Sequence, residues 1–451
     1  MRRVIVAGTH SGCGKTTVTC AVLAALKARG VNAAAFKCGP DYIDPMFHRE
    51  VIGVPSRNLD SFFCDDDTLR YLLYENAADS DIAVIEGVMG YYDGADGRGS
   101  AYSVSMLTDT PAVVVLDCRG MSDSIGAVMK GFLGYREPSG IAGFIFNRLP
   151  ERLVPLAKRL CGELGTEWLG CLPKTDITIE SRHLGLVTAE EITDIKERLN
   201  ALGELAEKHI DIDGIMRLSE RECPAYTAPA VNAVNGGIPP VIAVAKDRAF
   251  CFIYEDNMDL LGKLGCEIRY FSPLADSRVP DDADGLILPG GYPELYAERL
   301  SANKEMLADI RGKINSGLPT IAECGGFMYL HDSFTDMDKT EYAGAGVIHG
   351  KVYRTAKLQR FGYVTLTAKT GNLLCAAGES FPAHEFHYFE STACGSDMTA
   401  AKSDGRTWDC VHADAHLYAG FPHLYFYADT RLAGRFVSAC AEFKEKNGKN
   451  T

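Results

Sequence analysis

Long apolar runs are missing from this sequence of 451 residues, and so is any excess of positive charge. No apolar stretch approaches the ~18 residues that a membrane-spanning helix needs, so we expect no membrane association. The formal net charge is −14, which disfavours nonspecific binding to nucleic acid. An anionic substrate would therefore have to be met by a local basic pocket.

Paired cysteine motifs are also missing. The 15 cysteines are odd in number and never occur as C-x-x-C. This pattern disfavours a disulfide framework and a structural zinc site, and it is typical of a reducing compartment, so we expect a cytoplasmic protein. Hydrophobic residues make up 46% and charged residues 24% of the chain, as in ordinary globular enzymes.

Short β-rich runs alternate with helical stretches along both halves of the chain. In the first half these runs are RRVIVAG, NAAAFK, DIAVIEG, PAVVVLD and IAGFIFN, and in the second half PVIAVAKD, EIRYFSP, DGLILPGG and PTIAECGG. Such alternation predicts parallel sheets covered by helices, with ligands at the carboxyl ends of the strands. A Pro-, Ala- and Gly-rich stretch predicts a linker at 218–239 between domains 1–217 and 240–451.

The stretch AGTHSGCGKTT joins the first predicted strand to a helical pattern over 16–29. At such a turn, backbone N–H groups and the positive end of the helix dipole converge on one anion. The loop has one residue more between Gly8 and Gly14 than the usual Walker A pattern, and so resembles dethiobiotin synthetase and its relatives, which activate carboxylates with ATP. We expect ATP to be bound by Gly12, Gly14, Lys15, Thr16 and Thr17.

Polar residues follow the predicted strands of the first domain. Glu86 closes DIAVIE and Asp41 lies in the loop after AAAFK, so both are predicted to ligate Mg²⁺ together with Thr16. Two further acidic candidates follow the same strands, Asp44 and Asp93. Asn147, at the end of IAGFIFN, is predicted either to read the nucleotide base or to cap the next helix.

Nine motifs, in order, resemble the cobyrinate a,c-diamide synthase family (CobB/CbiA): GTHSGCGKTT, KCGPDYIDPMFH, RNLD, EGVMGYYDG, ESRHLGL, DRAFCFIYEDN, LPGGYPEL, AECGGFMYL and HEFHY. The resemblance implies an α/β protein with two domains. The first would be a P-loop, dethiobiotin-synthetase-like parallel-sheet domain, and the second a flavodoxin-like class I glutamine amidotransferase domain of the CobBQ type. It also implies amidation of the a and c acetates of cobyrinate, a tetrapyrrole, in cobalamin biosynthesis, with ATP, L-glutamine and Mg²⁺ and through acyl phosphates.

The stretch PTIAECGGFMYL places Cys324 on a tight turn between a predicted strand and a helix. A nucleophile on such a turn needs small neighbours, and a helix N-terminus favours a thiolate. The pattern resembles the nucleophile turn of class I glutamine amidotransferases. The preceding LPGGYPE offers the backbone N–H groups around Gly290 and Gly291 as an oxyanion hole.

A thiol nucleophile also needs a base, and the resemblance assigns this role to His423 in GFPHLYFY. Triad amidotransferases commonly carry a Glu two positions after this His, but here that position is Tyr425. We therefore expect a Cys–His pair whose imidazole is oriented by another group. His412 and His416 are weaker candidates for the base.

The stretch HEFHYFE contains His384 and His387, which are three positions apart. Zinc sites of the H-E-x-x-H type place their histidines four apart on a helix, so zinc binding is disfavoured here. A role near the domain interface or the substrate is the remaining hypothesis.

A tetrapyrrole with several carboxylates needs cations and a flat apolar surface in its pocket. The candidate contacts are Tyr42, Asp44, Asp93, Arg182 and His183, with Lys37 and Arg57.

Three alternatives stay open. The first is a nickel-sirohydrochlorin a,c-diamide synthase of coenzyme F430 biosynthesis, which shares these motifs. The second is cobyric acid synthase, although KCGPDYIDP and EGVMGYYDG look like the a,c type. The third is an ATP-driven switch with a degenerate amidotransferase-like binding module. The metal state of the ring, the order of the amidations, the ammonia route and the oligomeric state are not predicted.

Overall fold

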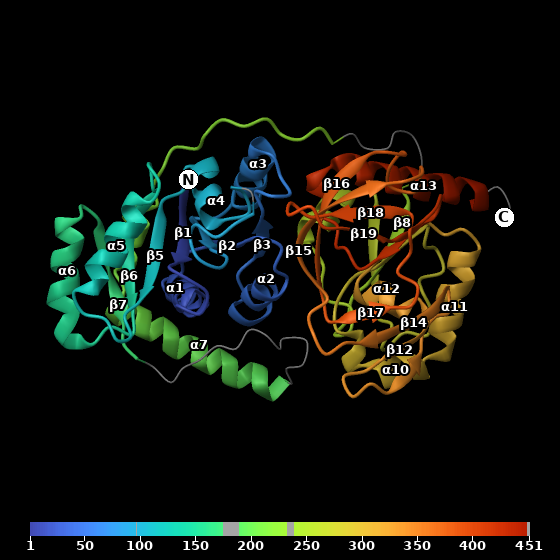
Figure 1. Cartoon of the computed structure of the whole chain (residues 1–451), viewed down its shortest axis with the longest axis horizontal. Helices are drawn as coiled ribbons and strands as arrows, with labels where there is room; N and C mark the ends of the chain where they lie inside the picture. The colour runs from blue at the N-terminus through green and yellow to red at the C-terminus, as the bar shows by residue number, and fades with distance from the viewer. Residues whose placement is uncertain (96, 175–188, 232–238, 449–451) are drawn as a thin grey trace. The chain divides into compact units, whose positions relative to one another are not determined.

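The computed structural model describes residues 1–95, 97–174, 189–231 and 239–448. The chain divides into two compact units, Met1–Pro229 and Ala230–Thr451 (Figure 1). The boundary between them lies within the stretch that the composition predicts as a linker.

Unit 1 is built on one parallel sheet, as the alternation of strand and helix predicts. Its strand order is β3-β2-β4-β1-β5-β6-β7. The strands are β1 (Arg2–Gly8), β2 (Ala33–Cys38), β3 (Ser56–Leu59), β4 (Ile82–Glu86), β5 (Ala112–Asp117), β6 (Ile141–Asn147) and β7 (Glu167–Leu172). The central strands are apolar throughout because both faces of the sheet are covered by helices.

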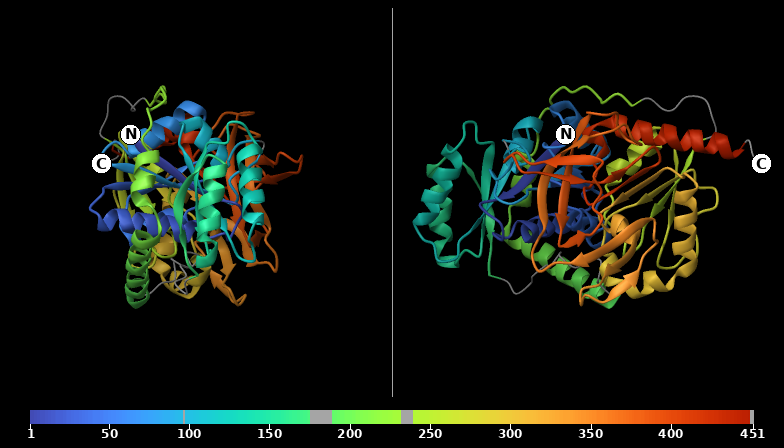
Figure 2. Two further views of the ribbon diagram at one scale, coloured as in Figure 1. Left: turned by 90° about the vertical axis from the view of Figure 1, so that its left-hand side faces the viewer. Right: turned by 45° about the vertical axis from the view of Figure 1, so that its right-hand side comes forward.

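Helices cover both faces of the unit 1 sheet (Figure 2). Helices α1, α7 and α8 share one core with inward residues of β1, β4 and β5, whereas α4 contacts the other face of β1. The helices are α1 (Lys15–Ala28), α2 (Ile43–Phe47), α3 (Asp66–Asn76), α4 (Ala101–Thr108), α5 (Ser124–Gly134), α6 (Val154–Glu163), α7 (Ala189–His209) and α8 (Ile212–Leu218), with the short turns η1 (His48–Ile52) and η2 (Glu151–Leu153).

Arg3 holds the segment after α8 against β1. Its side chain is fully buried, and its guanidinium donates to the carbonyl oxygens of Thr108, Asp109, Arg221 and Glu222. The guanidinium thus supplies five fixed donors where several backbone acceptors converge. The first residues of the predicted linker, 219–222, therefore pack on unit 1.

Unit 2 is built on a six-stranded sheet in the order β20-β21-β11-β10-β8-β9, parallel except for the β20–β21 pair. Its strands are β8 (Val241–Ala245), β9 (Glu267–Phe271), β10 (Gly285–Leu288), β11 (Thr320–Glu323), β20 (His412–Ala413) and β21 (Leu417–Gly420). Its helices are α9 (Glu255–Lys263), α10 (Ala297–Ala302), α11 (Lys304–Asn315), α12 (Gly325–Tyr329) and α13 (Thr430–Gly448), with the turns η4 (Pro293–Leu295) and η5 (Phe426–Ala428).

Two four-stranded sheets lie between α12 and β20 in the sequence, and the sequence reading did not predict them. One has the order β13-β12-β14-β17 and the other β16-β15-β18-β19. Their strands are β12 (His331–Thr335), β13 (Glu341–Ala343), β14 (Ile348–Arg354), β15 (Arg360–Ala368), β16 (Ser380–His387), β17 (Phe389–Ser391), β18 (Met398–Ala401) and β19 (Thr407–Cys410).

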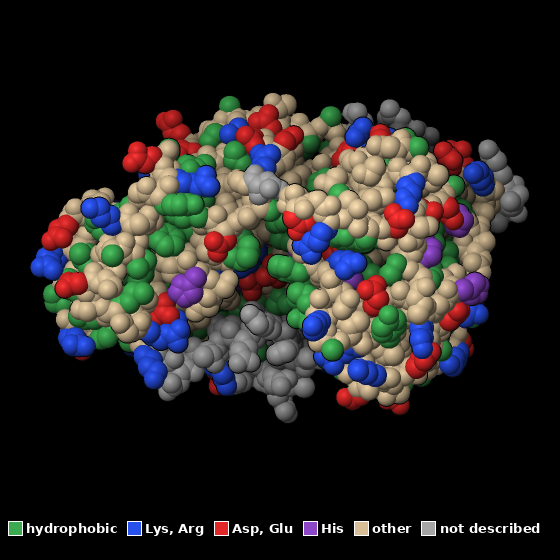
Figure 3. Space-filling view, viewed as in Figure 1, with side chains coloured by type: hydrophobic (Ala, Val, Ile, Leu, Met, Phe, Trp, Pro, Cys, Tyr) green, Lys and Arg blue, Asp and Glu red, His purple; other side chains and the backbone are tan. Residues whose placement is uncertain are grey.

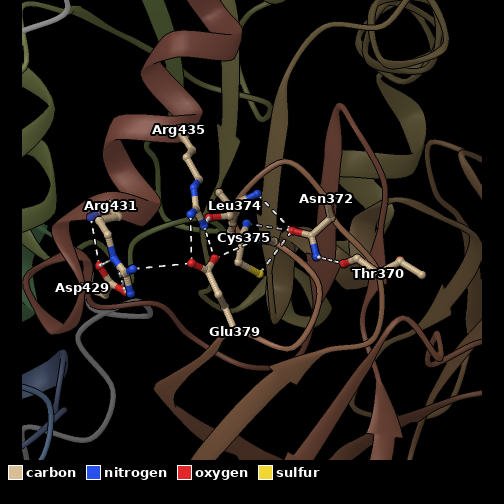
Figure 4. A network of polar contacts seen from close by, with 9 residues as sticks. Thr370, Asn372, Leu374, Cys375, Glu379, Asp429, Arg431 and Arg435 are labelled. Carbon is tan, nitrogen blue, oxygen red and sulfur yellow. Dashed lines mark hydrogen bonds and ion pairs between the residues drawn. The ribbon is translucent and has the colours of Figure 1, made fainter.

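A polar network ties the C-terminal helix α13 to the turn before β16 (Figure 4). Arg435 donates to both carboxylate oxygens of Glu379 and, at 3.1 Å, to the carbonyl oxygen of Leu374. The bonds from Arg435 and from the backbone N–H of Ala376 lower the pKa of Glu379 to about 2. Asn372 Oδ1 caps the same turn by accepting from the backbone N–H of Leu374 and Cys375. The start of β16 is therefore fixed to α13.

The surface carries charges of both signs. On the face shown in Figure 3, Lys and Arg side chains are interspersed with Asp and Glu. Among the described residues, we find no helix that combines the length and the apolar character needed to cross a membrane. All 15 cysteines are free thiols.

Candidate active sites

The loop between β1 and α1 in unit 1 carries the candidate nucleotide-binding residues. Gly14 has a φ of 103°, and a Cβ there would lie 2.1 Å from Asn147 Nδ2, so this position requires glycine. Asn147 Nδ2 donates to the carbonyl oxygen of Cys13 at 2.9 Å. Asn147, at the end of β6, therefore supports the loop, and its contact with a nucleotide base stays a prediction.

The first turn of α1 faces this loop. Lys15 Nζ donates to the carbonyl oxygen of His10 at 3.2 Å, so the side chain folds back over the loop. Burial lowers the pKa of Lys15. Thr16 and Thr17 are partly exposed in the same turn, and Gly12 has a left-handed φ of 79°. The arrangement is a helix N-terminus with a lysine beside it, which suits phosphate.

Glu86 contacts polar side chains from neighbouring strands and helices. Thr16 Oγ1 donates to Glu86 Oε1 at 2.6 Å, and Lys37 Nζ lies 3.0 Å from the same oxygen. His48 Nε2 lies 3.3 Å from Glu86 Oε2. Burial favours the neutral acid, but Lys37 and His48 outweigh it and hold the pKa of Glu86 well below its usual range. Lys37 Nζ also pairs with Asp44 Oδ2 at 2.5 Å.

The Thr16–Glu86 pair fits a Mg²⁺ ion, because P-loop enzymes hold this ion with a hydroxyl and a carboxylate oxygen. Asp41 is more weakly supported: its Oδ1 accepts from the backbone N–H of Ile43, while burial and Asp44 raise its pKa to about 6. The described residues contain no group of three or more His, Cys, Asp or Glu that could hold a metal by themselves. Nucleotide oxygens would therefore have to complete the coordination.

Three of the predicted substrate contacts lie in described loops and helices of unit 1. Tyr42 is buried just before α2, and Asp44 pairs with the buried Lys37. The exposed Asp93 accepts from the backbone N–H of Gly90 at 2.8 Å and so caps its own loop. Two further predicted contacts lie outside the described residues, Arg182 and His183.

In unit 2, Cys324 stands on the turn between β11 and α12. Its φ of 45° and ψ of −100° are strained for a residue with a side chain, as in nucleophile turns of other enzymes. A Cβ on Gly326 would lie 2.0 Å from the carbonyl oxygen of Leu288, so the first turn of α12 packs closely against the end of β10. The backbone N–H of Cys324 donates to Gly420 on β21 at 2.8 Å.

His423 follows β21 and makes a side-chain hydrogen bond with Cys324. Burial lowers the pKa of His423, but Cys324 and Glu323 outweigh it and raise the pKa to about 10. Backbone bonds of 2.8 and 3.2 Å pair His423 with His384 on β16, so the HEFHY stretch holds the backbone of this candidate base. The other two candidate bases bond elsewhere, His412 to Ala393 and His416 to Asp414.

Gly290 lies beside the His423 ring, and Gly291 lies beside the residue that follows Cys324. A Cβ on Gly290 would lie 2.5 Å from His423 Cε1, and a Cβ on Gly325 would lie 3.1 Å from Gly291 N. Their position after β10 brings this backbone next to the nucleophile turn. An oxyanion hole made by these N–H groups stays a prediction that this proximity favours.

Sequence reasoning left open which group orients His423, and it did not connect Glu323 with this histidine. Glu323 Oε2 lies 3.5 Å from His423 Nδ1, and Glu323 Oε1 accepts from the backbone N–H of Leu424 at 3.2 Å. The sequence signal that could have identified Glu323 was its place directly before Cys324, the candidate nucleophile. The proximity of β11 and β21 was not visible in the sequence.

Comparisons with known proteins match both units. A family model described as a CobQ/CobB/MinD/ParA nucleotide binding domain matches residues 4–187, and one described as a CobB/CobQ-like glutamine amidotransferase domain matches residues 241–430. Cobyrinate a,c-diamide synthase of Priestia megaterium is 37% identical over 466 residues, covering 99% of this chain and 98% of the relative. The chain belongs to the cobyrinate a,c-diamide synthase family. It joins a nucleotide-binding domain to a glutamine amidotransferase domain, as the motifs predict.

A second cobyrinate a,c-diamide synthase and two solved structures also match the chain. Cobyrinate a,c-diamide synthase of Thermoplasma volcanium is 37% identical, covering 98% of each chain. Among solved structures, PurLQS of Thermotoga maritima matches with a TM-score of 0.33 and 16% identity, over 46% of this chain and 99% of that one. The MinD cell division protein of Aquifex aeolicus matches with a TM-score of 0.33 and 14% identity, over 49% of this chain and 95% of that one.

Proposed function

We propose that this enzyme amidates the a and c acetate side chains of cobyrinate in cobalamin biosynthesis, using ATP and L-glutamine. The observation that carries the proposal is similarity to cobyrinate a,c-diamide synthases over 98–99% of the chain. The contacts of the two sites support it, because a phosphate loop and a Cys–His pair are the two kinds of site that this chemistry needs.

In unit 1, a carboxylate of the substrate attacks the γ-phosphate of ATP, which gives an acyl phosphate and ADP. The N-terminus of α1 and Lys15 would hold the phosphates. Thr16 and Glu86 would hold Mg²⁺, and this ion, when bound, neutralises charge on the transferred phosphoryl group. Ammonia then attacks the acyl carbon, and the amide forms as phosphate leaves.

In unit 2, the sulfur of Cys324 attacks the side-chain amide carbon of glutamine. Because the pKa of His423 is raised to about 10, its imidazole holds a proton at neutral pH and can give it to the leaving nitrogen. Ammonia departs and leaves a thioester. A water molecule then gives a proton to His423 and hydrolyses the thioester, which releases glutamate and frees the thiol. The free thiols throughout the chain suit a reducing compartment, and we place the enzyme in the cytoplasm.

The test is amidation of cobyrinate and of nickel-sirohydrochlorin by the purified full chain with ATP and glutamine. We expect two amides per cobyrinate. Cys324→Ala should abolish the reaction with glutamine and retain it with high ammonia, whereas Lys15→Ala should abolish both. Preference for nickel-sirohydrochlorin would assign the enzyme to F430 biosynthesis. Glutamine-dependent activity in Cys324→Ala would refute the assignment of Cys324 as the nucleophile. Failure to amidate either macrocycle would favour the ATP-driven switch.

A further inference from the structure

We propose that Glu323 is the positioning carboxylate of the glutaminase site and replaces the Glu that triad amidotransferases carry at the position of Tyr425. This inference rests on the proposed function, since it concerns how the Cys324–His423 pair works. Glu323 does not touch the reacting atoms in this account. It acts through the imidazole.

Geometry is the first support. The Glu323 carboxylate spans two successive residues after β21: Oε2 lies 3.5 Å from His423 Nδ1, and Oε1 accepts from Leu424 N at 3.2 Å. The bond from Leu424 N fixes the carboxylate, because a backbone N–H is a rigid donor. The contact between Oε2 and Nδ1 then sets the rotation of the His423 ring. With Nδ1 facing Glu323, Nε2 is the nitrogen left for Cys324.

The local backbone explains why the carboxylate reaches His423. Strands β11 and β21 are parallel neighbours, with Glu323 opposite Gly420 in register. The backbone N–H of Cys324 donates to the carbonyl oxygen of Gly420, so the two chains leave the sheet together. Glu323 therefore lies at the end of β11, next to the end of β21, and His423 follows β21 by three residues.

The position two residues after His423 carries Tyr425 instead of the Glu of triad amidotransferases. Tyr425 is fully buried, and its hydroxyl donates to Asp256 Oδ2 at 2.9 Å. Its pair with Asp256 ties η5 to α9. A phenol hydroxyl is neutral at physiological pH and cannot balance an imidazolium as a carboxylate does. The negative charge beside the ring is supplied by Glu323, which has only 7% of its surface exposed.

Other charged and titratable groups around His423 come from two elements. Cys324 faces it from the nucleophile turn, and His384, Glu385 and His387 act on it from β16. Burial favours the uncharged imidazole of both β16 histidines and lowers their pKa values to about 3 and 4. Burial also raises the pKa of Glu385 to about 7. Glu323 is the carboxylate that lies at ion-pair distance from the ring, with Oε2 3.5 Å from His423 Nδ1.

The experiment compares Glu323→Gln with Tyr425→Phe in the full chain, by glutamate release from glutamine and by synthesis driven by ammonia. Gln keeps the size and an acceptor but removes the charge. We expect Glu323→Gln to lower kcat of the glutaminase roughly tenfold to hundredfold, a part of what general acid–base catalysis supplies. KM for glutamine and the ammonia-driven rate should change less than twofold. Tyr425→Phe should stay within threefold of the wild type.

The pH profile separates positioning from a merely structural role. Without Glu323 the imidazolium is less stable, so the alkaline limb of kcat/KM should move to lower pH in Glu323→Gln. Glu323→Asp keeps the charge one methylene further from Nδ1, so its kcat should fall between those of the wild type and Glu323→Gln. This variant also decides the matter if Glu323→Gln does not fold.

Wild-type kcat with an unshifted alkaline limb in Glu323→Gln, or wild-type kcat in Glu323→Asp, would overturn the inference. A large loss in Tyr425→Phe alone would assign the role to the Tyr425–Asp256 pair instead. If the wild type itself released no glutamate from glutamine, the proposed function would fail rather than this inference.

Discussion

Substituting Gly290 by alanine tests the geometry of the glutaminase site with a single methyl group. The new Cβ would lie 2.5 Å from His423 Cε1 and 3.3 Å from Phe252 Cδ2, whereas ordinary contact begins at 3.4 Å. The ring cannot yield freely, because Glu323 lies on its Nδ1 side and His384 pairs with its backbone. The backbone N–H of residue 290 is retained, so the change probes the position of the imidazole.

The size of the effect follows from the displacement. Relieving the contact from 2.5 to 3.4 Å requires about 0.9 Å of movement in the ring or the loop. A misplacement of about 1 Å at a catalytic group costs roughly a hundredfold in rate, or about 2.7 kcal/mol of barrier. We therefore expect Gly290→Ala to lower kcat/KM for glutamine hydrolysis about a hundredfold.

The assay measures glutamate release and ammonia-driven amide synthesis on the same preparation. Synthesis from ammonia should be unchanged, because it does not use His423. The matched control is Gly312→Ala on α11, where an added Cβ meets nothing within 4 Å. That control should retain its glutaminase and gain roughly 0.5–1 kcal/mol of helix stability. Glutaminase within threefold of the wild type in Gly290→Ala would refute the proximity of residue 290 to the working imidazole.

Two further predictions concern stability. Arg3→Ala removes the guanidinium that donates to five backbone carbonyl oxygens, so the unfolding free energy of unit 1 should fall by roughly 3 kcal/mol; an unchanged thermal midpoint would contradict this. Burial raises the pKa of Glu385 to about 7 from a usual 4.5, so its neutral form stabilises the fold below pH 4.5 and this contribution is lost as the pH rises through about 7. The loss amounts to about 3 kcal/mol, and Glu385→Gln should abolish it; parallel stability–pH curves for the two proteins between pH 5 and 8, measured by denaturant titration, would refute the assignment.

Contiguous features were the predictable part of this molecule. The phosphate loop, the nucleophile turn at Cys324 and the parallel sheet of unit 1 each depend on residues close together in the sequence, and local pattern is enough to recognise them. The two inserted four-stranded sheets were not predicted. Their strands are short, and their pairings depend on neighbours far along the chain.

Side-chain partners were harder to predict than elements. Lys37 was a candidate for binding the substrate, but strands β2 and β4 are neighbours, so it lies buried between Glu86 and Asp44. Glu323 was visible beside Cys324, yet its contact with His423 depends on β21 lying next to β11. Periodicity identifies a strand, whereas the order of strands in a sheet decides which side chains meet.

The central claim is that one chain combines ATP-dependent activation of a carboxylate with release of ammonia from glutamine. The most direct measurement is the stoichiometry of phosphate and glutamate released by the purified wild type, with cobyrinate, ATP and glutamine all saturating. We expect one phosphate and one glutamate for each amide formed, and a large drop in glutamate release when cobyrinate is left out. Phosphate release that proceeds without glutamate production, with either cobyrinate or nickel-sirohydrochlorin, would contradict it.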